Sequence, residues 1–173
     1  MSEEMLDILN PDTGEVIGIA PRKQCHGDNT LWHRAVHVLV FHPVTGDILL
    51  QKRAENKLIQ PGKWDSSVGG HVSAGETIGE ALLRETEEEI GLKPDMTSFV
   101  HLFDYRIHNE LESELVTVYR MESIGPFAFP ADEIDELNFF PQAELIRRLK
   151  ADDCADLTPV LQRELAMQFG IAQ

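Results

Sequence analysis

Short apolar runs, alternating or continuous, divide the first part of the chain into two hairpins and one further strand. Each hairpin is centred on a stretch with turn chemistry, Asn10-Pro11-Asp12-Thr13-Gly14 and His42-Pro43-Val44-Thr45-Gly46. A third apolar run leads into a glycine loop. The strands that this pattern predicts cover residues 6–9, 15–20, 35–41, 47–53 and 64–68.

The second part of the chain mixes helical and strand periodicity. Residues 77–90 repeat apolar positions at helical spacing, and two strand-like runs follow, near residues 98–107 and 115–122. Pro141 is placed to begin a helix, and residues 157–169 form a closing one. With no repeat or linker in its 173 residues, the chain is expected to be a single α/β domain, with an N-terminal hairpin at about 6–20 and C-terminal helices at about 141–170.

Composition and charge narrow the class of partner. The formal charge of −15 argues against general affinity for nucleic-acid polymers, and the apolar runs are too short to cross a membrane. Cys25 and Cys154 lack a metal-type spacing, and the chain shows no secretory signal, so we expect reduced thiols in a cytoplasmic protein. The oligomeric state stays open, with a homodimer as one alternative.

The richest chemical signal is the segment 70–92, which reads Gly70-x5-Glu76-x7-Arg84-Glu85-Thr86-Glu87-Glu88-Glu89-Ile90-Gly91-Leu92. On a helix, three of its glutamates fall on one stripe beside the small residue Ala81. The opposite side is expected to face the core, and the remaining charged residues to face solvent. The stripe is Glu85, Glu88 and Glu89; the expected core side is Gly79, Leu83, Thr86 and Ile90; the expected solvent side is Glu80, Arg84 and Glu87.

This spacing predicts a divalent-cation site for diphosphate chemistry. Mg²⁺ binds carboxylate oxygens together with substrate phosphates, and Mn²⁺ is an alternative. Glu85, Glu88 and Glu89 are the expected ligands, one of them also serving as base, and Gly70 lets the backbone approach anionic oxygens. Arg84 can hold Glu80 or Glu88 one turn away, or join a surface ion pair.

The segment 70–92 resembles the Nudix box, GX5EX7REUXEEXGU with U apolar, and every invariant position is present; only Thr86 departs, at the first U. The resemblance implies a Nudix-type α/β/α sandwich with a mixed sheet, which periodicity alone does not give. It also implies a hydrolase acting on a small-molecule diphosphate. An acidic enzyme with a polyanionic substrate needs local positive charge, and Arg53 and Lys57, just before the box, are the expected phosphate contacts.

A wider similarity, over roughly residues 6–150, is to the isopentenyl-diphosphate isomerase-like branch of that superfamily. It is carried by stretches such as His33-Arg34-Ala35, Pro61-Gly62-Lys63-Trp64-Asp65, Gly70-His71 and Glu112-Ser113-Glu114. The resemblance implies a second divalent metal, such as Mn²⁺ or Zn²⁺. It also matches Arg53 and Lys57 to diphosphate contacts. The positions that match isomerase metal ligands are His26, His33, His71, Glu112 and Glu114.

Departures from that branch argue against isomerase chemistry. Gly69 stands where isomerases carry a proton-transferring cysteine, and no tryptophan occurs near Leu157 to Val160, where one should face the cationic intermediate. We therefore expect Mg²⁺-dependent hydrolysis of a nucleoside diphosphate linked to a group X, or of another organic diphosphate. The alternatives are an isopentenyl-diphosphate isomerase and a non-catalytic nucleotide-sensing module. A weaker candidate for the base is an acidic loop with Glu133, Asp135 and Glu136.

Overall fold

A long central strand organises the sheet in the computed structural model, which describes residues 2–173. Strand β3 (Trp32–Phe41) pairs antiparallel with β1 (Met5–Leu9), β4 (Ile48–Arg53) and β6 (Val68–His71). On its other side it runs parallel to β8 (Ser113–Glu122) along its whole length. β3 therefore carries residues from the first hairpin, the glycine loop and the later strands into one neighbourhood.

Four more strands complete a nine-stranded mixed sheet. β2 (Val16–Pro21) pairs with β1, and β7 (Val100–His108) pairs with β8. β5 (Trp64–Asp65) and β9 (Ile134–Phe140) both pair antiparallel with β4. The two hairpins and the pair of later strands are confirmed to within a few residues.

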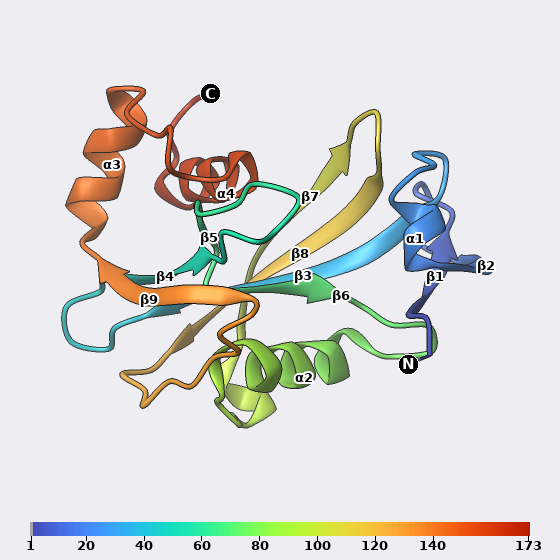
Figure 1. Cartoon of the computed structure of the whole chain (residues 1–173), viewed down its shortest axis with the longest axis horizontal. Helices are drawn as coiled ribbons and strands as arrows, with labels where there is room; N and C mark the ends of the chain where they lie inside the picture. The colour runs from blue at the N-terminus through green and yellow to red at the C-terminus, as the bar shows by residue number, and fades with distance from the viewer. Residues whose placement is uncertain (1) are drawn as a thin grey trace.

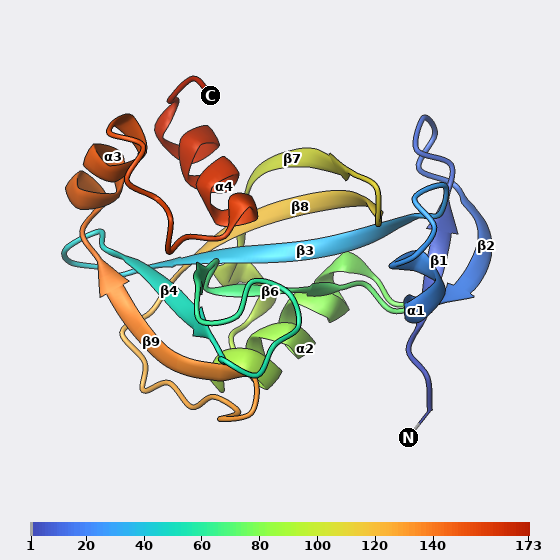
Figure 2. The ribbon, with the colours of Figure 1, turned by 45° about the horizontal axis from the view of Figure 1, so that its top comes forward.

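Helices cover both faces of this sheet. α2 (Ile78–Ile90) lies on one side of β3 and β8, while α3 (Gln142–Lys150) and α4 (Pro159–Phe169) lie on the other (Figures 1 and 2). The short α1 (Arg22–Cys25) and the 3₁₀ turn Met96–Ser98 are connections. None of the helices within residues 2–173 is both long and apolar enough to span a bilayer.

Side chains of β3 alternate between the two layers, as the period of a strand requires. Val36, Val38 and Val40 enter the core beneath α2, where they meet Ala81, Leu82 and Ile90. The intervening Ala35, Leu39 and Phe41 enter the core beneath α3 and α4, with Leu145, Leu161 and Leu165. This is the α/β/α sandwich with a mixed sheet that the Nudix resemblance implied.

Four local expectations are corrected. The acidic stretch near Glu133 is not a loop before Phe139, because residues 134–140 form β9, paired with β4 across a distance that local pattern does not report. The expected strand 64–68 divides into β5 and β6. Pro141 is the residue before α3 rather than its first residue, and α1 was not expected.

Cys25 and Cys154 are both free and buried.

Helix α2 is bounded by strong local signals. Thr77 and Glu80 form a capping box, in which Thr77 Oγ1 accepts from Glu80 N at 3.1 Å and Glu80 accepts from Thr77 N at 2.8 Å. Gly91 ends the helix in the left-handed conformation, with φ of 73°. A Cβ at Gly91 would meet the Ala128 carbonyl at 2.8 Å, so both backbone angle and space select glycine there.

The core face of α2 differs from the helical-wheel expectation. Leu82 is fully buried, whereas Leu83 is only partly covered, and Ala81 lies in the core rather than lining the acidic stripe alone. Thr86 and Ile90 are buried, as expected. The helix is thus rotated by about one residue from the expected orientation, and this rotation brings Glu85 under cover while Glu88 stays exposed.

Candidate active site and histidine cluster

Arg84 is the centre of an ion-pair network at the start of α2. Its Nε and Nη2 donate to the two carboxylate oxygens of Glu76 at 2.8 and 2.9 Å, and its Nη1 donates to Glu85 at 2.6 Å. Nη2 also donates to the carbonyl oxygen of His71 at 3.0 Å. The hydrogen bonds that Arg84 donates to Glu76 and Glu85 hold its pKa well above the ordinary value. Arg84 is therefore a positioning group, and the expectation that it faces solvent is wrong.

Glu85 is held against the glycine loop. Its residue is only 8% exposed, and burial raises the pKa of its carboxyl group. A Cβ at Gly70 would overlap that carboxyl group, which Arg84 already grips from the other side. Glycine at position 70 therefore leaves the space that the Glu85 carboxyl group occupies, and a larger residue there would force this side chain to move.

Glu89 and Glu88 occupy contrasting environments. Glu89 Oε1 accepts from Gln51 Nε2 at 3.0 Å, and Oε2 accepts from the backbone N–H of Gly69 at 2.8 Å. Burial raises the pKa of Glu89 to about 8. The Glu88 side chain is 59% exposed and contacts Arg84 Nη1 at 3.4 Å. Of the pairings expected for Arg84, the one with Glu88 is present, whereas Glu80 is used in the cap.

The donor set on α2 fits a hard divalent cation. It offers carboxylate oxygens only, and a glycine leaves room beside one of them. Burial and the charge of Glu85 both raise the pKa of Glu89, and a nearby cation would act against this rise. In this structure Arg84 Nη1 contacts both Glu85 and Glu88, while Glu89 is tied to Gln51 and Gly69. Glu85 and Glu88 thus share one support and Glu89 has another, and within residues 2–173 the three carboxylates are not drawn together into one ligand cluster.

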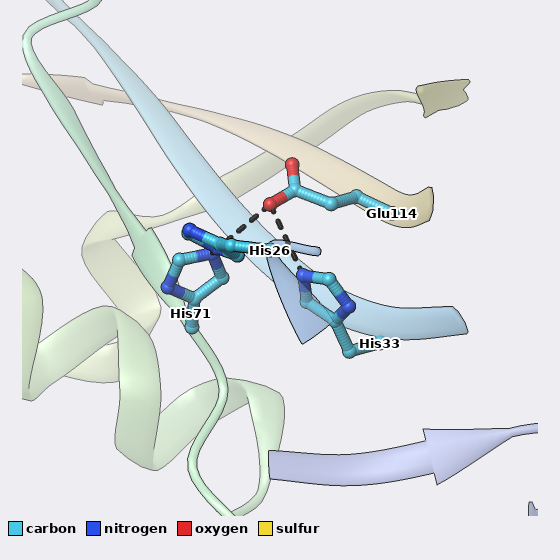
Figure 3. A group of neighbouring side chains, drawn as sticks. All are labelled: His26, His33, His71 and Glu114. Carbon is cyan, nitrogen blue, oxygen red and sulfur yellow. Dashed lines mark hydrogen bonds and ion pairs between the residues drawn. The ribbon is translucent and has the colours of Figure 1, made fainter. Parts of the chain in front are cut away.

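A second group gathers three imidazoles around one carboxylate (Figure 3). His26 follows α1, His33 lies on β3, His71 ends β6, and Glu114 lies on β8. Among residues 2–173, these four residues form the set in which one potential ligand atom of each lies within 4.8 Å of all the others. Four elements that are distant in sequence therefore converge on one point.

Hydrogen bonding aims ring nitrogens of this group inward. His33 Nδ1 lies 3.1 Å from the Leu31 carbonyl, which can only accept, so Nδ1 carries a proton and Nε2 faces Glu114 at 3.3 Å. His71 Nε2 lies 2.9 Å from the same Glu114 oxygen and 3.3 Å from His26 Nε2. Imidazole nitrogens with one carboxylate are donors suited to Mn²⁺ or Zn²⁺.

Charges in this histidine cluster follow from its burial. Burial lowers the pKa of His26 to about 4, so its ring is neutral at physiological pH. For Glu114, burial acts to raise the pKa, but hydrogen bonds from His33 and His71 outweigh it and hold the pKa well below its ordinary value. Glu112 lies beside the cluster, with Oε2 3.4 Å from His26 Nε2, but it is not among the four gathered ligands.

The two expected phosphate contacts line one cavity of about 430 Å³. Arg53 donates to the Ile59 carbonyl at 3.1 Å and lies 3.5 Å from Asp65, while Lys57 pairs with Glu133. Arg22 lines the same cavity and also borders a second one beside His26. Sequence reasoning missed Arg22, although the pair Arg22-Lys23 stands just before His26 and could have drawn attention to it.

Comparison with known proteins bears on this site directly. The NUDIX domain family model matches residues 31–163, which include both β3 and the whole of α2. The chain belongs to the NUDIX family. Its enzyme class is that of the Nudix hydrolases, which act on phosphoanhydride bonds.

Individual relatives extend the NUDIX assignment over nearly the whole chain. Nudix hydrolase 3 of Arabidopsis thaliana is 35% identical over 99% of this chain, which spans only 23% of the plant protein's length. A Clavibacter michiganensis protein named isopentenyl-diphosphate Delta-isomerase is 34% identical over 97% of this chain and 91% of its own length. This second relative is consistent with the branch inferred from the histidine and Glu112–Glu114 positions.

The fold has a close counterpart among solved structures. The crystal structure of DR0079 from Deinococcus radiodurans superposes with a TM-score of 0.71, at 24% identity, over 94% of this chain and 99% of that one. At this level of identity the comparison shows the NUDIX fold alone.

Proposed function

We propose that this chain is a divalent-metal-dependent hydrolase of small organic diphosphates, such as a nucleoside diphosphate linked to a group X. Water attacks one phosphorus of the P–O–P bridge, the bridging P–O bond breaks, and two phosphate-bearing products leave. The proton lost by the water is taken by a carboxylate on α2.

One observation carries this proposal: the buried Glu85 carboxyl group lies against the backbone of Gly70, in the space that a Cβ there would occupy. Arg84 donates to that carboxylate at 2.6 Å. Its guanidinium group also donates to Glu76 and to the backbone carbonyl of His71. Such a fork fixes geometry before substrate arrives, which is how an enzyme favours a transition state over the ground state.

The chain's own residues divide the work. Glu85, Glu88 and Glu89 would hold Mg²⁺ or Mn²⁺, and such a cation neutralises phosphate charge and acidifies bound water when present. Arg53 and Lys57, with Arg22 beside them, bind the diphosphate in the cationic cavity. Glu89 is the proposed base, because hydrogen bonds from Gln51 and from the backbone of Gly69 fix its position.

A second divalent ion is proposed at the histidine cluster. His26, His33, His71 and Glu114 present four potential ligand atoms within 4.8 Å, and the Leu31 carbonyl orients the His33 ring so that its Nε2 faces Glu114. His71 also links this cluster to the catalytic helix, since its carbonyl accepts from Arg84 at 3.0 Å. Glu112 is proposed only as an outer group that fixes His26.

The residues 1–173 are proposed to work as one Nudix unit. The support is that the N-terminal and C-terminal segments both contribute to the site: His26 follows the first hairpin, and Glu164 on α4 reaches β3. The substrate is proposed to be a small molecule held in this unit.

Isomerase chemistry is the second candidate, favoured by the similarity to the Clavibacter michiganensis protein. Gly69 argues against it, because glycine has no side chain that could transfer a proton. The His37 ring also lies beside Gly69, so that a Cβ added there would be only 3.1 Å from the ring. A sensing module is also less favoured, because the three glutamates expected to bind the metal, Glu85, Glu88 and Glu89, are all retained.

The deciding experiment is a panel of nucleoside diphosphates linked to different groups X, together with isopentenyl diphosphate, assayed with Mg²⁺ for the two phosphate-bearing products and for a shifted double bond. We expect hydrolysis of the P–O–P bridge, and a loss of kcat on the order of 10²-fold or more in Glu89→Gln. Glu87→Gln is the matched control, because Glu87 is exposed on the opposite side and should leave the rate unchanged. A shifted double bond without hydrolysis would establish the isomerase, and binding without turnover across the panel would establish the sensor.

A further inference from the structure

A buried ion pair joins the central strand to the closing helix. His37 on β3 donates from Nδ1 to Glu164 on α4, 127 residues away. The Glu164 side chain is completely buried and that of His37 is 13% exposed. Since an unpaired charge at this depth would cost several kcal/mol, each group requires the other.

Glu164 is satisfied on both oxygens by protein donors. Tyr105 donates to Oε1 at 2.7 Å, alongside His37, and Ser66 donates to Oε2. Burial favours the neutral imidazole, but the charge and hydrogen bond of Glu164 outweigh it and raise the pKa of His37 to about 9. The pKa of Glu164 is correspondingly lowered, mainly by the charge of His37 against the effect of burial. The ring is thus an oriented imidazolium.

The other edge of this imidazolium is open. Across residues 2–173 His37 Nε2 has no hydrogen-bond partner, although as an imidazolium nitrogen it carries a proton to donate. Gly69 lies over this edge, and a Cβ there would stand 3.1 Å from Cδ2 and 3.2 Å from Nε2, a tight fit. The glycine therefore keeps the donor uncovered.

The open edge also adjoins the catalytic residues proposed above. Gly69 donates its N–H to Glu89 at 2.8 Å, and its neighbour Gly70 lies against Glu85. His37 and Gly69 are directly paired in the β3–β6 ladder. The unused donor thus lies one residue along β6 from the proposed hydrolytic centre, on the α4 face of the sheet, whereas Glu85 and Glu89 belong to the helix on the other face.

We propose that His37 donates its Nε2–H to an anionic or carbonyl oxygen of the bound substrate, and that Glu164 is the positioning residue that keeps the ring charged and oriented. This inference rests on the proposed function, and it adds a specificity: group X or the diphosphate must present an oxygen acceptor there. A hydrocarbon tail against this imidazolium would leave the donor desolvated and unpaired, so prenyl diphosphates are disfavoured.

The test compares His37→Gln with the parent, using inorganic diphosphate and ADP as probes in Mg²⁺ and isothermal titration calorimetry as the readout. Loss of a charge-assisted hydrogen bond should weaken affinity about 10-fold or more. Weakening for both probes places the oxygen on the diphosphate, and weakening for ADP alone places it on the attached group. His101→Gln is the matched control, since that ring is 49% exposed and pairs with Asp104.

The positioning role of Glu164 has its own signature in the pH profile of binding. The groups facing His37 are Glu164 on α4, Tyr105 on β7, Asp65 on β5 and Glu114 on β8. A raised pKa means that the parent keeps its donor charged until pH passes about 9, so parent affinity should hold across pH 6–8. Glu164→Gln should lose affinity over that range, and Glu164→Asp should restore part of it.

Thermal unfolding of each variant separates this role from a purely structural one. A structural role alone would lower the Tm of Glu164→Gln without changing its pH profile, and that result would overturn the inference. Unchanged probe affinity in His37→Gln, or a parent that binds neither probe, would overturn it as well. Hydrolysis measured on the same samples keeps the two proposals apart. If the parent hydrolyses a substrate but His37→Gln binds the probes as well as the parent does, only this inference is removed. If no compound of the panel is hydrolysed, the proposed function is removed.

Discussion

Position 70 shows how one missing side chain shapes the site. The sequence pattern places a glycine before the helix and an acidic stripe on it, and both features are present. The structure adds the partner: the space that a Cβ would take at Gly70 is filled by the Glu85 carboxyl group, pinned there by Arg84. A small residue at position 70 is therefore favoured by the space that Glu85, a candidate catalytic residue, occupies, and not by the backbone conformation of position 70.

Gly70→Ala tests this packing. The added methyl group must push Glu85 away from Arg84, and a misplaced carboxylate should lower kcat on the order of 10²-fold. The measurement is Mg²⁺-dependent hydrolysis of the best substrate of the panel. Gly18→Ala is the matched control, because a Cβ there meets only Ile8 at 3.9 Å, an ordinary contact. Full activity in Gly70→Ala would show that Glu85 can move without consequence.

Individual residues also mark how far sequence alone could reach. The positions of the box can be read from spacing, because helical geometry is local. Ligands named through family resemblance, such as His33 and His71, do come together with Glu114. The pairing of His37 with Glu164 could not be foreseen, because it depends on which residue of α4 meets β3 across 127 positions. No local pattern carries that information.

At the scale of elements, α2 was the easiest to predict and β9 the hardest. A capping box, a C-terminal glycine and a helical repeat all agree over residues 77–91. β9 carries acidic residues on its exposed side and relies on a non-local ladder with β4, so its sequence is ambiguous between loop and edge strand. The rotation of α2 that buries Leu82 rather than Leu83 also depends on tertiary packing, which sets the side facing the sheet.

The cap of α2 gives a prediction at this scale. Thr77→Ala removes the acceptor for Glu80 N and should lower the free energy of unfolding by about 1 kcal/mol. Because Arg84 and Glu76 brace the same helix turn from outside the cap, the rate of hydrolysis well below the Tm should change little. Urea denaturation measures the loss, with Thr77→Ser as the control that retains the hydroxyl. Equal stability of the two variants would contradict the capping role.

At the scale of the whole molecule, the histidine cluster connects the N-terminal segment to the sheet. This segment does not belong to either of the two main hydrophobic clusters. His26 belongs to the N-terminal segment, whose small core of Leu6, Ile8, Ala20 and Cys25 is separate from the two main clusters. Through His26, that segment meets the ends of β3, β6 and β8 (Figure 3). A metal bound there would therefore strengthen the attachment of the N-terminal hairpin (β1 and β2) to the rest of the sheet.

Mn²⁺ or Zn²⁺ added to metal-stripped protein should therefore raise the Tm. Binding to the folded state alone stabilises it by about 2.7 kcal/mol at a ligand concentration of 100 times Kd. Glu114→Gln replaces the only carboxylate among the four gathered donors and should abolish most of the shift, together with the metal content measured on the purified protein. Glu112→Gln is the matched control, because Glu112 contacts His26 from outside that group and should keep the shift. If Glu89→Gln rather than Glu114→Gln removed the stabilisation, the ion responsible would be the one on α2, and the cluster would be a hydrogen-bonded junction without metal.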